Sequence, residues 1–383
     1  MILRPKAVSH WVSFLHSRKH LYFPQRRIIS SNSAQKTLNE LPAPMVGSSH
    51  RNSGDRSSLA HPCIFSSKTS AQTQKPPVEI HKALPTDYKP IPPLALATLV
   101  ALAKPRLTAL VVLSAMSTYA LSPFCSTFTT LLFFAPGTLL CAASANSLNM
   151  WLEPPFDAQM ARTRNRPLPR GLLSPSTAFL FAIGTGASGL SLLFYGVNTT
   201  TALLGLGNIV LYAGVYTPMK RYSILNTWVG SLVGAIPPLM GWAATTPDLF
   251  SHPGGLLLAG LLFAWQFPHF NSLAWTLRSD YFRAGYRMMS VTNPSLNARV
   301  SLRYSLLTFP ICFGLAIYGV VDPGFIFSSS CVNSYLTFYA WRFWRWGGDS
   351  NARKLFWASL WHLPAVMMLG MLHKMGNWDG ILY

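Results

Sequence analysis

The stretch from residue 146 to residue 171 reads NSLNMWLEPPFDAQMARTRNRPLPRG and closes an otherwise apolar segment. In it, Asn149, Glu153 and Asp157 recur at every fourth residue, so their oxygens would lie on one face of a helix. Carboxylate oxygens are ligands of Mg²⁺, which usually takes phosphate oxygens as well. Arginines, whose planar donors match phosphate, follow at once: Arg162, Arg164, Arg166 and Arg170. The stretch therefore predicts a metal and diphosphate site at the end of a helix.

The composition indicates a membrane protein. Of the 383 residues, 50% are hydrophobic and 11% are charged, against roughly 25% charged in a typical soluble domain. The formal net charge of +20 invites a nucleic-acid interpretation, but the positive residues after residue 89 lie in loops between apolar runs. No segment resembles an RNA-binding or DNA-binding module, so no nucleic-acid partner is expected. The five cysteines are scattered and are interpreted as free thiols.

The first part of the chain differs from the rest. Residues 1–39 contain seven basic residues, many serines and no acid, which is typical of a mitochondrial transit peptide. Residues 40–92 are polar and rich in Pro and Ser, so we expect a disordered linker there. The predicted transmembrane domain is 93–377.

Nine apolar runs approach the ~20 residues that a helix needs to cross a bilayer. The sequence therefore predicts an all-α polytopic membrane protein. The predicted spans are 106–122, 129–152, 175–195, 200–217, 224–244, 256–277, 303–321, 324–341 and 355–373.

The loops between these spans are basic on one side only. Fifteen Lys and Arg residues follow the second, fourth, sixth and eighth spans, whereas the loops after the first, third, fifth and seventh spans contain none. Such an asymmetry orients a membrane protein with its basic loops inside, which in the mitochondrial inner membrane is the matrix side. The acids Glu153, Asp157, Asp280 and Asp349 lie on the same side. Acids and bases gathered at one set of helix ends indicate a site rather than attraction to lipid alone.

Two prolines interrupt the acidic row, which consists of Asn149, Glu153 and Asp157. Pro154 and Pro155 remove two backbone donors and disfavour a regular helix, so we expect the helix to bend or end near Glu153. The alternative interpretation of the row is a solvated helix terminus. Ionisable groups at membrane depth are costly and usually functional, which favours the metal site.

A second polar group ends the sixth span, where residues 265–289 read WQFPHFNSLAWTLRSDYFRAGYRMM. His269 would lie about 13 Å deeper than Arg278 at the rise of a helix. Asp280, flanked by Arg278 and Arg283, would supply the other half of a diphosphate site. The alternatives are a surface ion pair between Asp280 and Arg283, and a His269 that is only a hydrogen-bonded core residue.

A third, smaller group follows the fourth span, in the sequence YTPMKR. Lys220 and Arg221 would reach a diphosphate from this short loop. The alternative is that both side chains only extend to lipid headgroups.

At these residues the chain resembles the UbiA superfamily of intramembrane prenyltransferases, and within it the branch that farnesylates haem. The motifs that carry the likeness are NxxxExxxD with RTRNRPLPRG, YTPMKR, WQFPHF and DYFRAGY, within residues 95–375. The resemblance implies nine helices around a central cavity, farnesyl diphosphate bound through Mg²⁺, and haem b as the acceptor. Glu153 replaces the usual aspartate of the first acidic motif, and the second motif is reduced to Asp280. That reduction puts the coordination of a second metal ion in doubt.

The resemblance also implies roles for individual residues. Metal binding and catalysis would fall to Asn149, Glu153, Asp157 and Asp280. The diphosphate would be bound by Arg162, Arg164, Arg166, Arg170, Lys220, Arg221, Arg278 and Arg283. The porphyrin or its propionates would be oriented by His269, Lys104 and Arg106.

The implied reaction is attack of a haem vinyl group on C1 of the farnesyl chain, with water addition. It would give haem O, which a downstream haem A synthase would take in haem A biosynthesis for cytochrome c oxidase. The lipid bilayer is a further expected partner. Two alternatives stay open: a UbiA-type enzyme that prenylates an aromatic quinone precursor, and a polytopic transporter or haem-handling assembly factor. Transporters often contain inverted repeats, and the sequence contains no clear repeat.

Overall fold

The computed structural model describes residues 96–124 and 127–376. All of them belong to one compact unit, His81–Tyr383. The predicted transit peptide at 1–39 and the predicted linker at 40–92 lie outside the described residues. Within those residues the secondary structure is helical, apart from one isolated bridge between Val321 and Lys374.

Nine long helical segments, counted within the described residues, correspond one to one with the predicted spans. They are α3 (Pro105–Leu121), α4 (Phe128–Leu152), α6 (Pro175–Gly196), α7 (Thr199–Val210) continuing through the π-helical η2 (Leu211–Tyr216) and α8 (Thr217–Met219), α9 (Asn226–Ala243), α10 (Gly254–Thr276), α13 (Pro294–Ile317), α14 (Gly324–Trp346) and α15 (Gly348–Leu372). Four short helices accompany them: α2 (Leu96–Leu102), α5 (Pro154–Asp157), α11 (Arg278–Arg283) and α12 (Met289–Thr292). The all-α prediction is confirmed for this part of the chain.

The helices differ in how well they suit a bilayer. Five of the described segments are long and apolar enough to cross a membrane: α4, α6, Thr199–Met219, α13 and α15. A sixth candidate is the pair α2 and α3, which is bent by 53°. The polar, glycine, proline and aromatic residues of α9, α10 and α14 give these helices lower hydropathy.

Predicted and observed boundaries differ most at the starts of α13 and α15. α13 begins at Pro294 rather than at 303, and α15 begins at Gly348 rather than at 355. The first turns of both helices carry polar or charged residues, so an apolar run cannot mark them. Capping marks the start of α13 instead, because Asn293 accepts a hydrogen bond from the backbone N–H of Leu296 at 3.0 Å.

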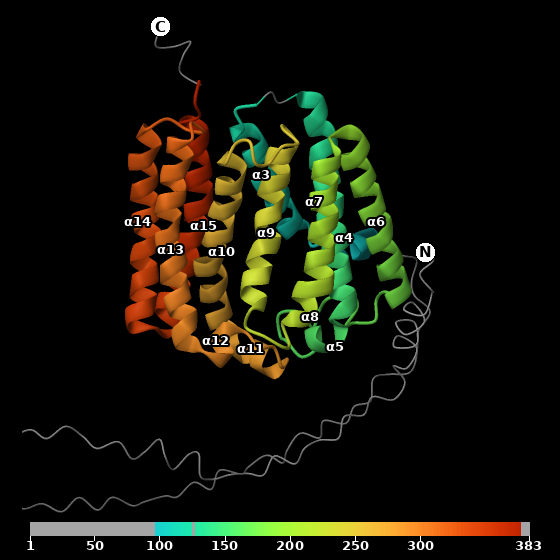
Figure 1. Cartoon of the computed structure of the whole chain (residues 1–383). Helices are drawn as coiled ribbons and strands as arrows, with labels where there is room; N and C mark the ends of the chain where they lie inside the picture. The colour runs from blue at the N-terminus through green and yellow to red at the C-terminus, as the bar shows by residue number, and fades with distance from the viewer. Residues whose placement is uncertain (1–95, 125–126, 377–383) are drawn as a thin grey trace, which may run out of the picture. The chain divides into compact units, whose positions relative to one another are not determined.

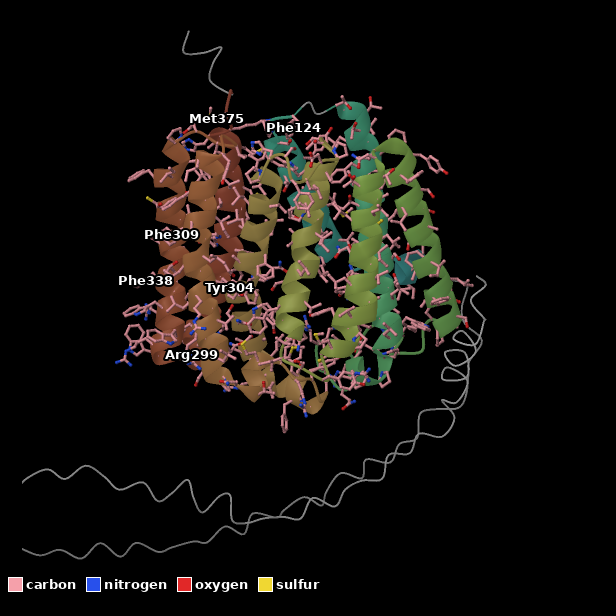
Figure 2. The ribbon with its side chains drawn as sticks, in the orientation of Figure 1. Phe124, Arg299, Tyr304, Phe309, Phe338 and Met375 are labelled. Atoms are coloured by element: carbon pink, nitrogen blue, oxygen red, sulfur yellow. The ribbon has the colours of Figure 1, made fainter. Side chains whose placement is uncertain are left out.

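The helices pack side by side and bring the basic loops to one end. α4 packs on α6, α3 on α9, and α10 lies against α9, α13 and α15. Figure 1 shows α5, α8, α11 and α12 at the same end of these helices. Figure 2 places Arg299 at that end and places Phe124 and Met375 at the opposite end. The loops after the second, fourth and sixth predicted spans therefore share one side.

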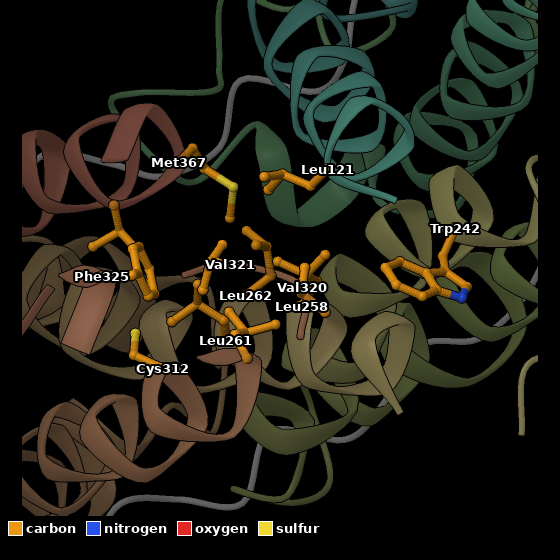
Figure 3. Packing of buried hydrophobic residues seen from close by; sticks show 12 residues of the cluster. Leu121, Trp242, Leu258, Leu261, Leu262, Cys312, Val320, Val321, Phe325 and Met367 are labelled. Carbon is orange, nitrogen blue, oxygen red and sulfur yellow. The ribbon is translucent and has the colours of Figure 1, made fainter. Parts of the chain in front are cut away.

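The largest apolar cluster joins α3, α9, α10, α13, α14 and α15 away from that end. Figure 3 shows Trp242 on one flank of this cluster, and Met367 and Leu121 facing each other on another. Close approach of backbones elsewhere in the bundle depends on glycine. On α9, a Cβ at Gly241 would overlap the backbone oxygen of Ala115 on α3. Small residues at such crossings allow membrane helices to pack tightly.

We predict that Gly241→Ala destabilises the bundle. The added methyl group would meet backbone atoms of α3, which yield little, and overpacking of this kind costs about 1–3 kcal/mol. Gly184→Ala on α6 is the matched control, since a Cβ there meets no atom within 4 Å. Thermal unfolding in detergent micelles should give a lower midpoint for Gly241→Ala and little change for Gly184→Ala. Equal midpoints for the two variants would contradict the close α3–α9 crossing.

Candidate functional site

The acidic row lies at a break between two helices, as the two prolines predict. α4 ends at Leu152, Glu153 adopts a non-helical backbone (φ −113°, ψ 16°), and α5 starts at Pro154. The three polar side chains are nevertheless buried: Asn149 is 2% exposed, Glu153 5% and Asp157 0%. Burial excludes the alternative of a freely solvated helix terminus.

Glu153 is held by a lysine from a distant part of the chain. Lys220 Nζ lies 2.8 Å from Glu153 Oε1 and 3.0 Å from Oε2. On the other side, Asn149 Nδ2 donates to Glu153 Oε2 at 2.7 Å and to Thr217 Oγ1 at 3.1 Å. Lys104 Nζ in turn donates to Asn149 Oδ1 at 2.8 Å. These contacts form one continuous polar chain in which two lysines flank one carboxylate.

Asp157 has its own counterion, from the arginine-rich loop that follows it. Arg166 NH1 donates to both carboxylate oxygens, at 2.8 Å and 2.7 Å. Thr163 Oγ1 donates to the backbone oxygen of Asp157 at 2.9 Å and closes the loop. Burial is the largest influence on the pKa of Asp157 and raises it, while the guanidinium of Arg166 acts in the opposite direction.

The other three arginines of the loop are exposed, and none forms an ion pair with a described acid. They are Arg162, Arg164 and Arg170. The sequence therefore predicts four equivalent arginines, whereas the structure distinguishes one that is paired from three that are free to meet a ligand.

The YTPMKR segment approaches the row through a π-helical turn. The π-helical η2 ends at Tyr216, and turns of this type often occur at functional sites. Lys220 Nζ lies 4.8 Å from the centroid of the Tyr216 ring and 5.8 Å from that of Tyr286. Arg221 lies 4.8 Å over the ring of Phe156. Lys220 therefore contacts the acidic row directly, whereas Arg221 packs against the ring of Phe156 next to it.

The charged residues of the second polar group, Asp280 and Arg278, lie in two different environments. Asp280 is buried and pairs with Arg283, so the predicted i, i+3 ion pair is present. Arg278 instead lies 3.8 Å from Asp349 and 4.9 Å over the ring of Trp275. Asp280 and Arg278 therefore have different ion-pair partners.

Aromatic packing connects the α11 segment to the acidic row. Tyr281 and Tyr286 belong to one apolar cluster with Met160, against which Phe156 packs. The rings of Phe156 and Tyr286 are 5.7 Å apart. In addition, the backbone N–H of Arg287 donates to the backbone oxygen of Lys220 at 2.8 Å. Three segments distant in sequence thus meet around Glu153 and Asp157.

His269 lies in a different environment, between α10 and α15. Its ring stacks on Trp265 at 4.6 Å and on Phe356 at 5.0 Å, and Nδ1 is 2.9 Å from Ser359 Oγ. These contacts match the alternative of a hydrogen-bonded core histidine. Lys104, predicted to act with it on haem, instead contacts Asn149, and Arg106 is exposed.

Tyr286 was not among the predicted site residues. It is 4% exposed, and burial, followed by the negative charge of the nearby Glu153, raises the pKa of its hydroxyl. Gly285 with φ +70° ends α11, and the backbone N–H of Tyr286 donates to the backbone oxygen of Tyr281 at 3.0 Å. This is the Schellman arrangement, which places an apolar side chain back against the helix. In the sequence, Ala-Gly-Tyr after a helix predicts this C-terminal cap. It does not predict which residues the tyrosine side chain contacts.

The acids do not form a metal cage by themselves. Over residues 96–124 and 127–376, no group of three or more His, Cys, Asp or Glu side chains is placed to hold a metal ion. Mg²⁺ is usually bound by one or two carboxylates together with substrate phosphates. The donors present therefore suit a metal that arrives with a phosphate ligand.

Two hollows stand out in the described part of the chain, and neither borders a predicted site residue. One is a void of about 10 Å³ within the cluster of Figure 3. The other is an open groove of about 400 Å³ between α13 and α14. The candidate site is therefore identified by its buried ion pairs and not by either of these hollows.

We predict that breaking the Asp157–Arg166 pair destabilises the fold, because each single change leaves one charge unpartnered. The Arg166 side chain is 21% exposed. We therefore expect a coupling of about 2 kcal/mol, below the roughly 3–5 kcal/mol of a fully buried pair. A double-mutant cycle with Asp157→Asn and Arg166→Met, measured as apparent unfolding free energy in detergent, gives this coupling. Strictly additive effects would mean that the pair does not form.

Known proteins with similar sequences point to one family. The pattern of the UbiA prenyltransferase family matches residues 107–363. The chain is 53% identical over 297 residues to the "Protoheme IX farnesyltransferase, mitochondrial" of Yarrowia lipolytica, covering 74% of this chain and 63% of that protein. It is 44% identical over 400 residues to the protein of the same name from Candida glabrata, covering 92% and 87%. The chain thus spans less than two thirds of the first of these relatives.

Solved structures of low sequence identity share the fold. A digeranylgeranylglyceryl phosphate synthase superposes with a TM-score of 0.63 at 13% identity, over 73% of this chain and 98% of the other. A UbiA homolog from Archaeoglobus fulgidus bound to DMAPP and Mg²⁺ gives 0.54 at 13% identity, over 71% and 98%. From the matching family pattern, the sequence relatives and this shared all-α fold, we conclude that the chain belongs to the UbiA prenyltransferase family.

Proposed function

We propose that this protein transfers the farnesyl group of farnesyl diphosphate to a vinyl group of haem b, giving haem O and diphosphate. The observation that carries the proposal is the pair of buried carboxylates, Glu153 and Asp157, each beside a cation. The names of the relatives support the choice of substrates. The haem O would then serve haem A synthesis, with a haem A synthase as the next enzyme.

The donors of the acidic row fit Mg²⁺. Asn149, Glu153 and Asp157 offer hard oxygen ligands, and the metal of the Archaeoglobus fulgidus homolog supports the same ion here. When bound, Mg²⁺ would neutralise charge on the diphosphate as it leaves. Asp280 is proposed as a further acidic ligand from the α11 side, although its present partner is Arg283.

The cations of the site would hold the diphosphate. Lys220 and Arg166 lie within the row, and their charges oppose the negative charge that develops on the leaving group. The remaining proposed diphosphate-binding residues are Arg162, Arg164, Arg170, Arg221, Arg278 and Arg283. The hydroxyl of Tyr286, which lies near Glu153, would add one neutral donor to this set.

The bond changes balance without an oxidant. The C1–O bond of the farnesyl diphosphate breaks, and its electron pair leaves with the diphosphate. The π electrons of the haem vinyl group form the new C–C bond to C1, and water adds to the resulting cation and loses a proton. The allylic cation needs a site from which water is excluded. Tyr216, Tyr286 and Phe156 would border it, with cation–π stabilisation from their rings.

Residues at the start of α3 and on α10 are proposed to position the haem. Lys104 and Arg106 lie at the start of α3 and would meet the propionates, because Lys104 already borders the row through Asn149. A haem-orienting role is also proposed for His269 on α10, although its present contacts are those of a core histidine. We also propose a mitochondrial inner-membrane location with the basic end in the matrix. The proposed organisation is a transit peptide at 1–39, a linker at 40–92 and a transmembrane domain at 93–377.

The decisive experiment is synthesis of farnesylated haem by the purified full chain. We expect product of the mass of haem O from haem b, farnesyl diphosphate and Mg²⁺, and none after chelation of the metal. Asp157→Asn should lower kcat/KM by about 10²-fold or more, because it removes a charged ligand. Absence of product from the wild type would refute the proposed function, whereas full activity of Asp157→Asn would refute the proposed site.

The hydroxyl of Tyr286 is the proposed donor that the sequence did not identify. Tyr286→Phe removes only the hydroxyl, and loss of one hydrogen bond to a charged ligand should lower kcat/KM for farnesyl diphosphate about tenfold. Tyr119→Phe is the control, because its hydroxyl donates to the backbone oxygen of Thr127 near the opposite end of α3. Steady-state kinetics with varied farnesyl diphosphate measure both. Equal effects of the two substitutions would exclude a role for Tyr286 in the site.

A further inference from the structure

Both carboxylates of the acidic row are already neutralised by cations of this chain. Glu153 is occupied by Lys220, and Asp157 is occupied on both oxygens by Arg166. These cations are also two of the residues proposed to hold the diphosphate. The same four side chains therefore have two sets of partners: each other, or a metal together with a phosphate ligand.

Resting on the proposed function, we infer that Lys220 and Arg166 are resident counterions that keep a divalent cation from binding alone. The metal enters only together with the diphosphate, because only then do all four charges change partners at once. The site thereby imposes an order of binding on the metal and the diphosphate.

The physical reason is burial. A divalent cation that approached Glu153 alone would have to displace a lysine whose side chain is itself largely buried. The displaced ammonium would remain near the metal, with like charges in a site of low dielectric. A diphosphate changes this balance, because its oxygens give Lys220 and Arg166 new partners while they complete the ligands of the metal.

Two further observations agree with this exchange. The described residues contain no acidic or His/Cys cluster of three that would hold a metal unaided. The ammonium of Lys220 also has a second environment nearby, since it lies over the rings of Tyr216 and Tyr286 at 4.8 Å and 5.8 Å. Those rings would stabilise the cation by cation–π attraction while it leaves Glu153.

The test measures binding of Mn²⁺, a paramagnetic substitute for Mg²⁺, to the full chain in detergent by electron paramagnetic resonance. No haem or farnesyl substrate is present. Wild type should bind Mn²⁺ alone only weakly, and inorganic pyrophosphate should increase Mn²⁺ retention at least tenfold. Lys220→Met should bind Mn²⁺ alone at least tenfold more tightly than wild type, because Glu153 loses its counterion. The same variant should bind pyrophosphate at least tenfold more weakly.

Arg299→Met is the matched control. It removes a positive charge at the same end of the bundle (Figure 2), but Arg299 is exposed, has no proposed role in the site and forms no ion pair with a described acid. Its affinity for Mn²⁺ alone should stay within threefold of wild type. The double variant Glu153→Gln/Lys220→Met removes both partners and should lose the gain seen in Lys220→Met. Arg166→Met provides the same metal-only measurement at Asp157 if Lys220→Met does not fold.

Three results would overturn the inference. The first is a wild type that binds Mn²⁺ alone as tightly as Lys220→Met, and the second is a gain of affinity in Arg299→Met as large as that in Lys220→Met. The double variant retaining the full gain would exclude Glu153 as the group released. Because haem O synthesis is measured separately, each of these results is distinguishable from failure of the proposed farnesyl transfer.

Discussion

Neutralisation of buried charge is the constraint on which the rest of this structure depends. Glu153 and Asp157 lie at the broken end of α4 with almost no exposure to solvent, where an unpaired carboxylate would be strongly destabilising. Their counterions must therefore be brought to them. The π-helical turn before α8 positions Lys220 beside Glu153. The loop after α5 folds back so that Arg166 pairs with Asp157. The local irregularities of the backbone thus serve one electrostatic requirement.

The same requirement relates the resting structure to the proposed chemistry. Cations that neutralise carboxylates in the absence of ligands are also suited to a departing diphosphate, and the carboxylates are suited to its metal. A site built this way is organised before the substrates arrive, with both carboxylates already paired to cations. Aromatic rings from three segments, Phe156, Tyr216 and Tyr286, border the charged groups.

Much of the fold was predictable because hydropathy and helix-breaking residues are local properties. The nine predicted spans correspond to nine long helical segments of the described residues, and Pro154 and Pro155 correctly place the break at Glu153. The start of α13 was misplaced because its first turns are polar and are recognised by capping, as at Asn293. At the site, Arg278 lies against Trp275 and near Asp349 from another helix, and no spacing in the sequence reveals these contacts.

The sequence by itself determined the helical class, the basic end of the bundle, and the residue types from which a metal and diphosphate site is built. These follow from composition, periodicity and motifs, which are readable along the chain. Only the tertiary structure decided the partners: Lys220 and Tyr286 near Glu153, and Lys104 with Asn149. The physical reason is that a charge–charge contact depends on distance in space, and helices far apart in sequence set that distance through their packing.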